Sequence, residues 1–106
     1  MIEMVAIRKT AILLAPILIL SMAVAQNAQD RIAQIAAALR NQQFDQALEL
    51  LRPALQQSPG NAELWTMQGV AYAGRGKKKE ALSSFRNALK ISPDIIPALQ
   101  GAAQIE

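Results

Sequence analysis

Apolar residues recur at helical spacing through most of the chain after residue 27. Two stripes in residues 28–57 share the spacing 0, 3, 4 and 7, which is typical of amphipathic helices. Two further stripes follow in residues 62–91. Together the four stripes consist of Ile32, Ile35, Ala36 and Leu39; Phe44, Ala47, Leu48 and Leu51; Leu64, Trp65, Gly69 and Tyr72; and Ala81, Leu82, Phe85, Ala88 and Leu89. The pattern predicts two pairs of helices.

Turn-forming residues separate these stripes. The segment Ser58-Pro59-Gly60-Asn61 is expected to end one helix and to cap the next through Asn61, and Ser92-Pro93-Asp94 is expected to do the same before a further helix. Residues 74–76, which include two glycines, should separate the helices of the second pair. The chain is rich in Ala, Leu, Ile and Gln, which favours helix over strand, so the fold class is predicted to be all-α.

A period of 34 residues relates the two helix pairs. When Ala28 and Ala62 are both set as position 1, four later pairs coincide: Ala47 with Ala81, Ala54 with Ala88, Leu55 with Leu89, and Pro59 with Pro93. A third copy begins at Ile96 and runs to Glu106. The repeat predicts unit one at residues 28–61, unit two at residues 62–95, and a partial third unit at residues 96–106.

Unit two resembles a tetratricopeptide repeat. That family prefers Trp, Leu, Gly, Tyr, Ala, Phe, Ala and Pro at eight spaced positions, and seven of the eight agree here. The eight residues are Trp65, Gln68, Gly69, Tyr72, Ala81, Phe85, Ala88 and Pro93. Gln68 stands where Leu is usual and is expected to loosen the contact between the paired helices. The resemblance implies helix-turn-helix units stacked into a short right-handed α-solenoid.

Residue size at these positions has a physical reason of its own. Gly69 and Ala81 are expected to be small because the two helices of a unit must approach closely where they cross. The large rings of Trp65, Tyr72 and Phe85 are expected to fill the gaps between units. We therefore assign Trp65 and Tyr72 to the core and not to a ligand-stacking site.

Residues 1–25 have the three-part layout of a signal peptide. Arg8 and Lys9 precede an apolar run, and small residues at positions 23 and 25 suit a signal peptidase. We expect cleavage after Ala25, a mature module over residues 26–106, and a secreted or periplasmic location. The alternative is an uncleaved membrane anchor, although the run over residues 11–25 contains Pro16 and is shorter than the roughly 20 residues that span a bilayer.

Composition argues against catalysis and metal binding. The sequence has no Cys and no His, so thiolate and imidazole chemistry is absent, and its carboxylates are scattered. We expect no enzymatic activity, no cofactor and no metal. After residue 25 nine Lys and Arg face seven Asp and Glu, a balance of +2 that is too small to indicate a nucleic-acid partner. The run Arg75, Lys77, Lys78 and Lys79 is interpreted as a solvated turn.

The resemblance also implies where a protein partner binds. In this family the first helix of each unit lines a concave face, and positions 2, 5, 9, 12 and 13 of the unit contact ligands. These positions are held by Gln29, Ile32, Ala36, Leu39 and Arg40, and by Glu63, Thr66, Val70, Ala73 and Gly74. Ile32 and Leu39 fit the packing of unit one equally well, and both interpretations stay open.

The predicted function is therefore an exported module for protein–protein interaction. One alternative is the amino-terminal piece of a longer repeat protein whose activity lies beyond residue 106, since repeat arrays usually need about three units. A second is a membrane-tethered assembly factor with an uncleaved leader. We also expect self-association through the C-terminal helix, where Leu99, Ala102, Ala103 and Ile105 form an uncovered apolar stripe.

Overall fold

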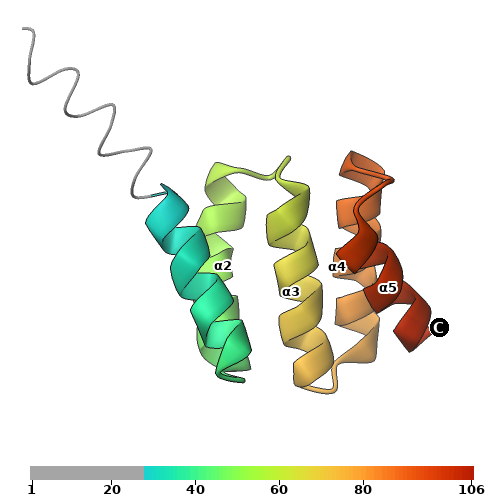
Figure 1. Cartoon of the computed structure of the whole chain (residues 1–106), viewed down its shortest axis with the longest axis horizontal. Coiled ribbons are helices and arrows are strands. Elements are labelled where there is room, and N and C mark those ends of the chain that lie inside the picture. Colours follow the sequence, from blue (N-terminus) through green and yellow to red (C-terminus); the bar gives the residue numbers. More distant parts are fainter. Residues whose placement is uncertain (1–27) are drawn as a thin grey trace, which may run out of the picture. The chain divides into compact units, whose positions relative to one another are not determined.

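The structure, a computed structural model, describes residues 28–106. These residues form helices and turns, with no strand among them. A helix seen over residues 28–40 is followed by α2 (Phe44–Gln57), α3 (Ala62–Gly74), α4 (Lys78–Ile91) and α5 (Ile96–Ile105) (Figure 1). The prediction of an all-α helical repeat is confirmed. The predicted signal peptide over residues 1–25 lies outside the described residues.

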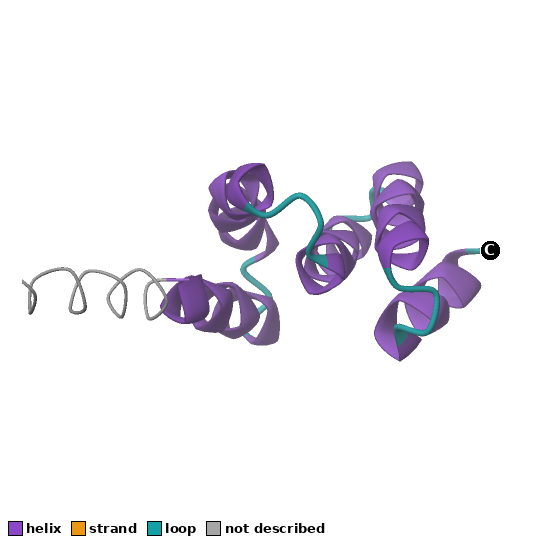
Figure 2. Ribbon diagram, turned by 90° about the horizontal axis from the view of Figure 1, so that it is seen from above, coloured by secondary structure: helices purple, strands orange, loops and turns teal. Residues whose placement is uncertain are grey.

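Residues 31–106 form one compact unit. The helix that ends at residue 40 and α5 lie on one side, α2 and α4 lie on the other, and α3 lies between them (Figure 2). The central helix α3 packs on α2, α4 and α5. This arrangement is typical of a repeated helix-turn-helix unit, because α2 and α4, the second helices of their units, lie on the same side and both pack on the intervening α3.

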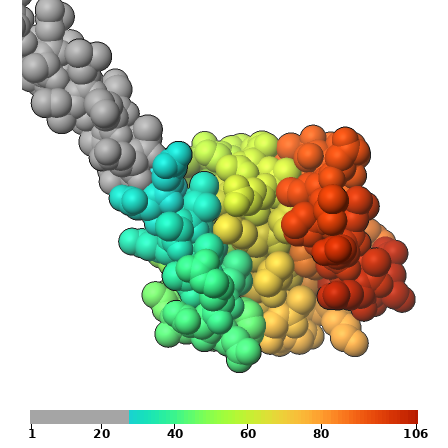
Figure 3. All heavy atoms as spheres, viewed as in Figure 1, coloured from blue at the N-terminus to red at the C-terminus, as the bar shows by residue number. Residues whose placement is uncertain are grey.

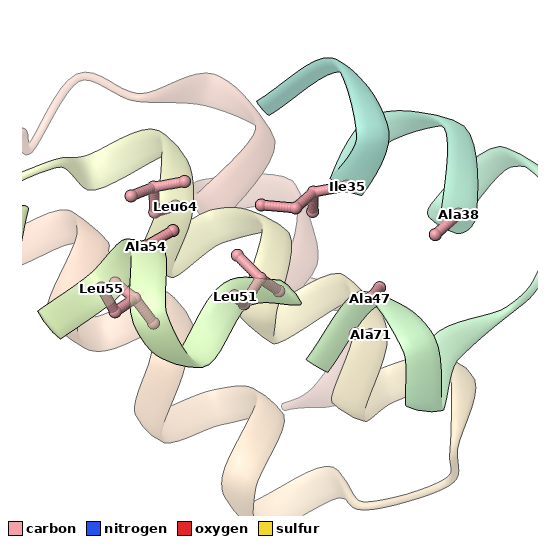
Figure 4. Close-up of a cluster of buried hydrophobic side chains, with 8 residues drawn as sticks. All are labelled: Ile35, Ala38, Ala47, Leu51, Ala54, Leu55, Leu64 and Ala71. Carbon is pink, nitrogen blue, oxygen red and sulfur yellow. The ribbon is translucent and has the colours of Figure 1, made fainter. Parts of the chain in front are cut away.

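A first buried cluster joins unit one to the start of unit two. It draws on the helix that ends at residue 40, on α2 and on α3, and Figure 4 shows its members: Ile35, Ala38, Ala47, Leu51, Ala54, Leu55, Leu64 and Ala71. Four of the eight are alanines, which let the helix backbones approach closely. The stripes predicted for residues 32–51 therefore form the packing face of unit one.

Phe85 is the centre of a second cluster, which also contains Ala81, Ala88 and Ala98. Its ring lies against two glycines that belong to different helices. A Cβ atom added at Gly69 of α3 would lie 2.5 Å from the ring, and one added at Gly101 of α5 would also collide with it. Gly69 was expected to be small so that two helix backbones could approach. The structure corrects this reason, because the space above Gly69 is filled by the Phe85 ring.

The caps of α3 and α5 differ. As predicted, Asn61 caps α3, because its Oδ1 accepts hydrogen bonds from the backbone N–H of Glu63 at 3.0 Å and of Leu64 at 3.4 Å. The prediction that the segment Ser92-Pro93-Asp94 caps α5 was wrong. The N-cap is Ile95, whose N–H donates to the Ser92 carbonyl at 3.2 Å in a turn, and no side chain caps this helix.

Candidate protein-binding surfaces

One face of the molecule exposes the first helix of each unit. Three helices reach the surface together on this side: the helix ending at residue 40, α3 and α5 (Figure 3). We call this side the first-helix face. Near the middle of α3, the Val70 side chain is 40% exposed. A large aliphatic side chain in this position is available to a partner without any rearrangement of the helices.

The predicted partner-binding residues differ in how far they reach solvent. Ile32, Ala36 and Leu39 are half-buried, whereas Gln29, Arg40, Glu63, Val70, Ala73 and Gly74 are exposed. Ile32 and Leu39 pack against the first cluster, so packing accounts for part of their surface. Gln29 lies outside the compact unit of residues 31–106.

Two of the predicted contact positions have packing roles. Thr66 is only 6% exposed, and its hydroxyl donates to the Ala62 carbonyl at 2.8 Å within α3. The Thr66 side chain therefore offers little surface to a partner in the free protein, and its hydroxyl is satisfied by the preceding turn of its own helix. At Gly74 an added Cβ atom would collide with the Phe44 ring, so this glycine provides room for the start of α2.

The opposite side of α3 forms a groove between α2 and α4. Within residues 44–105, α2 and α4 both pack on α3 but do not contact each other, so α3 is the floor. A hollow of about 350 Å³ lies between α2 and α3, and a second of about 330 Å³ lies between α3 and α4. Both hollows are lined by Trp65, Gln68 and Tyr72. We call the two hollows together the α2–α4 groove.

The two aromatic residues of this groove are packed on one side and open on the other. Trp65 and Tyr72 are half-buried; Trp65 packs against both clusters and Tyr72 against the second. The Trp65 indole N–H donates to the Pro59 carbonyl at 2.8 Å, which fixes the orientation of the ring. The assignment of both residues to the core is therefore correct for their inner faces, and their outer faces line the groove.

Gln68 ties α3 to α4 across the groove floor. The buried Ser84 hydroxyl lies 2.9 Å from Gln68 Oε1 and 3.0 Å from the Glu80 carbonyl, and its single proton is shared between these two acceptors. Gln68 was expected to loosen the helix pair, but this hydrogen bond replaces the apolar contact that Leu would make. The groove itself was missed by sequence reasoning, and the departure at Gln68 was the one signal of a polar floor.

The basic run begins in the turn after α3 and continues into α4. Lys78 and Lys79 belong to the first turn of α4, so the prediction that all four cations lie between helices is corrected. The helix starts there because the Ala81 N–H already donates to the Lys77 carbonyl at 3.0 Å. Arg75 Nε lies 2.9 Å from Asp45 Oδ1, and this exposed ion pair adds little stability.

The apolar stripe expected on α5 is only partly uncovered. Of its members, Leu99 is 47% exposed and Ala103 is exposed, whereas Ala102 and Ile105 pack against the second cluster. Ile96, which lay outside the predicted stripe, is 62% exposed. Ala98, which the stripe did not include, is fully buried. Self-association through this helix stays a prediction.

Two other features, a metal-binding cluster and a membrane-spanning helix, were sought in the described residues. Among residues 28–106 no group of three or more acidic side chains is placed to hold a metal ion. Within the same range no helix is long and apolar enough to cross a membrane.

Comparison with known families identifies the repeat. The family described as tetratricopeptide repeat matches residues 32–94. The chain belongs to the tetratricopeptide-repeat family. This family is a non-catalytic fold for protein–protein interaction, which agrees with a molecule that offers an exposed helix face and a groove.

Similar tetratricopeptide-repeat sequences occur in much longer proteins. Human Superkiller complex protein 3 is 32% identical over 68 residues, which is 64% of this chain and 4% of that protein. The mouse protein of the same name is 29% identical over 68 residues. The peroxisomal targeting signal receptor of Candida albicans is 29% identical over 58 residues, which is 55% of this chain and 10% of that protein. The chain thus spans a small fraction of each relative.

Proposed function

We propose that this tetratricopeptide-repeat protein is an exported interaction module that binds a partner polypeptide on the first-helix face. The observation that carries the proposal is Val70, a large apolar side chain that is 40% exposed near the middle of α3. Exposed Glu63 and Arg40 lie on first helices as well and would add polar contacts. Interfaces commonly combine an apolar centre with a polar rim, and this set of residues supplies both.

Val70→Glu tests the proposed contact. Burying a carboxylate against a partner without an opposite charge is costly, so we expect retention of the partner to fall by roughly tenfold or more. The melting temperature should change by no more than about 2 °C because position 70 is exposed in the free protein. The measurement is quantitative mass spectrometry of the proteins that co-purify with the tagged chain from the exported fraction.

Gln56→Glu is the matched control for this substitution. Gln56 is an exposed residue of α2, and the change introduces the same charge away from the first-helix face. We expect the control to retain each partner at the wild-type level. If the wild type and Val70→Glu retain the partner equally, the proposed binding on the first-helix face is wrong.

The proposed export predicts a mature chain that begins at Gln26. Small side chains at positions 23 and 25 frame the expected cleavage site, and the basic and apolar segments before them support a leader. Intact-mass measurement of the exported protein should give the mass of residues 26–106. A product that keeps residues 1–25 would instead support the membrane-tethered alternative.

A further inference from the structure

We propose that the α2–α4 groove is a second docking surface, whose occupant is an acidic, extended segment of a partner protein. This inference goes beyond the proposed function because it uses the side of α3 away from the first-helix face. It rests on the shape of the groove, on its fixed floor and on the charges at its rim.

The shape of the groove suits an extended chain. The ridge from Trp65 to Tyr72 separates the two hollows and rises along α3 by about 10 Å, the length of roughly three extended residues. Successive side chains of an extended segment point to opposite sides, so neighbouring residues of the ligand can enter the α2-side and the α4-side hollows in turn. Each hollow is at the small end of the range of about 300–1,000 Å³ found for ligand pockets.

The floor of the groove is ordered before any ligand arrives. The hydrogen bond to the Pro59 carbonyl holds the Trp65 ring, so contact with the ring costs little conformational entropy. Ser84 engages the oxygen of Gln68, which leaves the amide nitrogen of Gln68 to donate to a backbone carbonyl of the ligand. A Leu at position 68, the residue that the family prefers, would offer no such donor.

The charge of the lining selects an acidic occupant. Arg52 and Lys77 line the hollow beside α2, and Lys79 lines the hollow beside α4. Against these three cations the lining of both hollows contains one carboxylate, that of Glu80. The lining therefore carries a net charge of +2, which lies in the hollow beside α2, while Lys79 and Glu80 balance in the hollow beside α4. This net charge attracts carboxylates to the groove and disfavours a basic segment.

Fluorescence of Trp65 reports directly on this groove because the sequence contains one Trp. The probe is a synthetic ten-residue peptide in which pairs of Glu alternate with pairs of Leu, so that carboxylates reach both hollows. It is acetylated and amidated at its ends and is added to the full chain. We expect a saturable change in Trp65 emission that weakens as salt is raised. A matched peptide with Lys in place of Glu should produce no saturable change.

Two neighbouring lysines provide the matched variants. Lys79→Glu places a negative charge at the groove and should lower the affinity for the acidic peptide by roughly fivefold or more. Lys78→Glu makes the same change in net charge on the adjacent residue, which lines neither hollow. This variant should lower the affinity for the acidic peptide by less than about twofold. Gln68→Leu should also lower the affinity for the acidic peptide, while the melting temperature of the protein stays the same or rises.

Two results would overturn this proposal. One is a Trp65 emission that the acidic peptide leaves unchanged up to its solubility limit. The other is equal weakening by Lys78→Glu and Lys79→Glu, which would show attraction to net charge alone. The Val70→Glu variant should bind the peptide as the wild type does, so failure here and failure of the first-helix face are distinguishable.

Discussion

Phe85→Ala is expected to lower the free energy of unfolding of the repeat module by about 3–5 kcal/mol. The Phe85 ring is 1% exposed and lies between Gly69 and Gly101, so its removal leaves a cavity shared by α3, α4 and α5. A module of this size has little stability in excess, and most of it would be lost. Urea denaturation followed by circular dichroism measures the change.

Lys78→Ala is the control for this loss. Lys78 is exposed in the first turn of the same helix, and its truncation should change the free energy of unfolding by less than about 0.5 kcal/mol. If Phe85→Ala were as stable as Lys78→Ala, the assignment of Phe85 to the centre of the second cluster would be wrong.

Gly69→Ala is expected to lower the free energy of unfolding by about 1–3 kcal/mol. The direction is unusual, because Gly→Ala inside a helix ordinarily raises stability by up to about 1 kcal/mol. At position 69 the new Cβ atom would lie 2.5 Å from the Phe85 ring, which is 1% exposed and also lies against Gly101. Thermal and urea unfolding of the purified variant measure the effect.

Two comparisons isolate the ring as the cause of this cost. Gly60→Ala adds the same methyl group where nothing lies within 4 Å, and it should be neutral or slightly stabilising. In a Phe85→Leu background Gly69→Ala should cost less than in the wild type, because the two sites are in contact. The same cost in both backgrounds would show that Gly69 is small for another reason.

The helices and the repeat could be predicted from the sequence because burial recurs with the same period as the residues. Ala47 and Ala81 are both fully buried, and Ala54 and Ala88 are both buried one turn before the end of their helices. These positions must stay small in each unit for the same geometric reason. The 34-residue register therefore carries direct information about packing.

Contacts between units could not be predicted in the same way. Gly101 lies against Phe85, but nothing in the local sequence indicates that a glycine of α5 meets a ring of α4. The N-cap of α5 is Ile95 and not a residue of the predicted capping segment, because of a backbone turn that the residue types do not specify. Pro53 lies inside α2 without ending it, and tertiary packing of the surrounding residues outweighs its helix-breaking tendency.

The candidate surfaces also divide into a part that the repeat predicts and a part that depends on the assembled fold. Val70 was predicted as a contact residue from its position in the repeat; the structure finds its side chain 40% exposed, and its contact with a partner stays a prediction. The α2–α4 groove depends on the space that remains when two helices pack on a third, and that space is a property of the assembled fold. The burial of Thr66 was equally hidden, because its hydroxyl bond to Ala62 follows from the helix and not from the repeat.

Site-specific photo-crosslinking in the cell that produces the protein tests the central claim most directly. A photoreactive amino acid is placed at Val70 on the first-helix face or at Gln56 on α2, both of which are exposed in residues 31–106. We predict that position 70 yields a discrete adduct with another polypeptide and that position 56 yields none of that mass. Identical adduct patterns from the two positions, or adducts from position 56 alone, would contradict partner binding on the first-helix face.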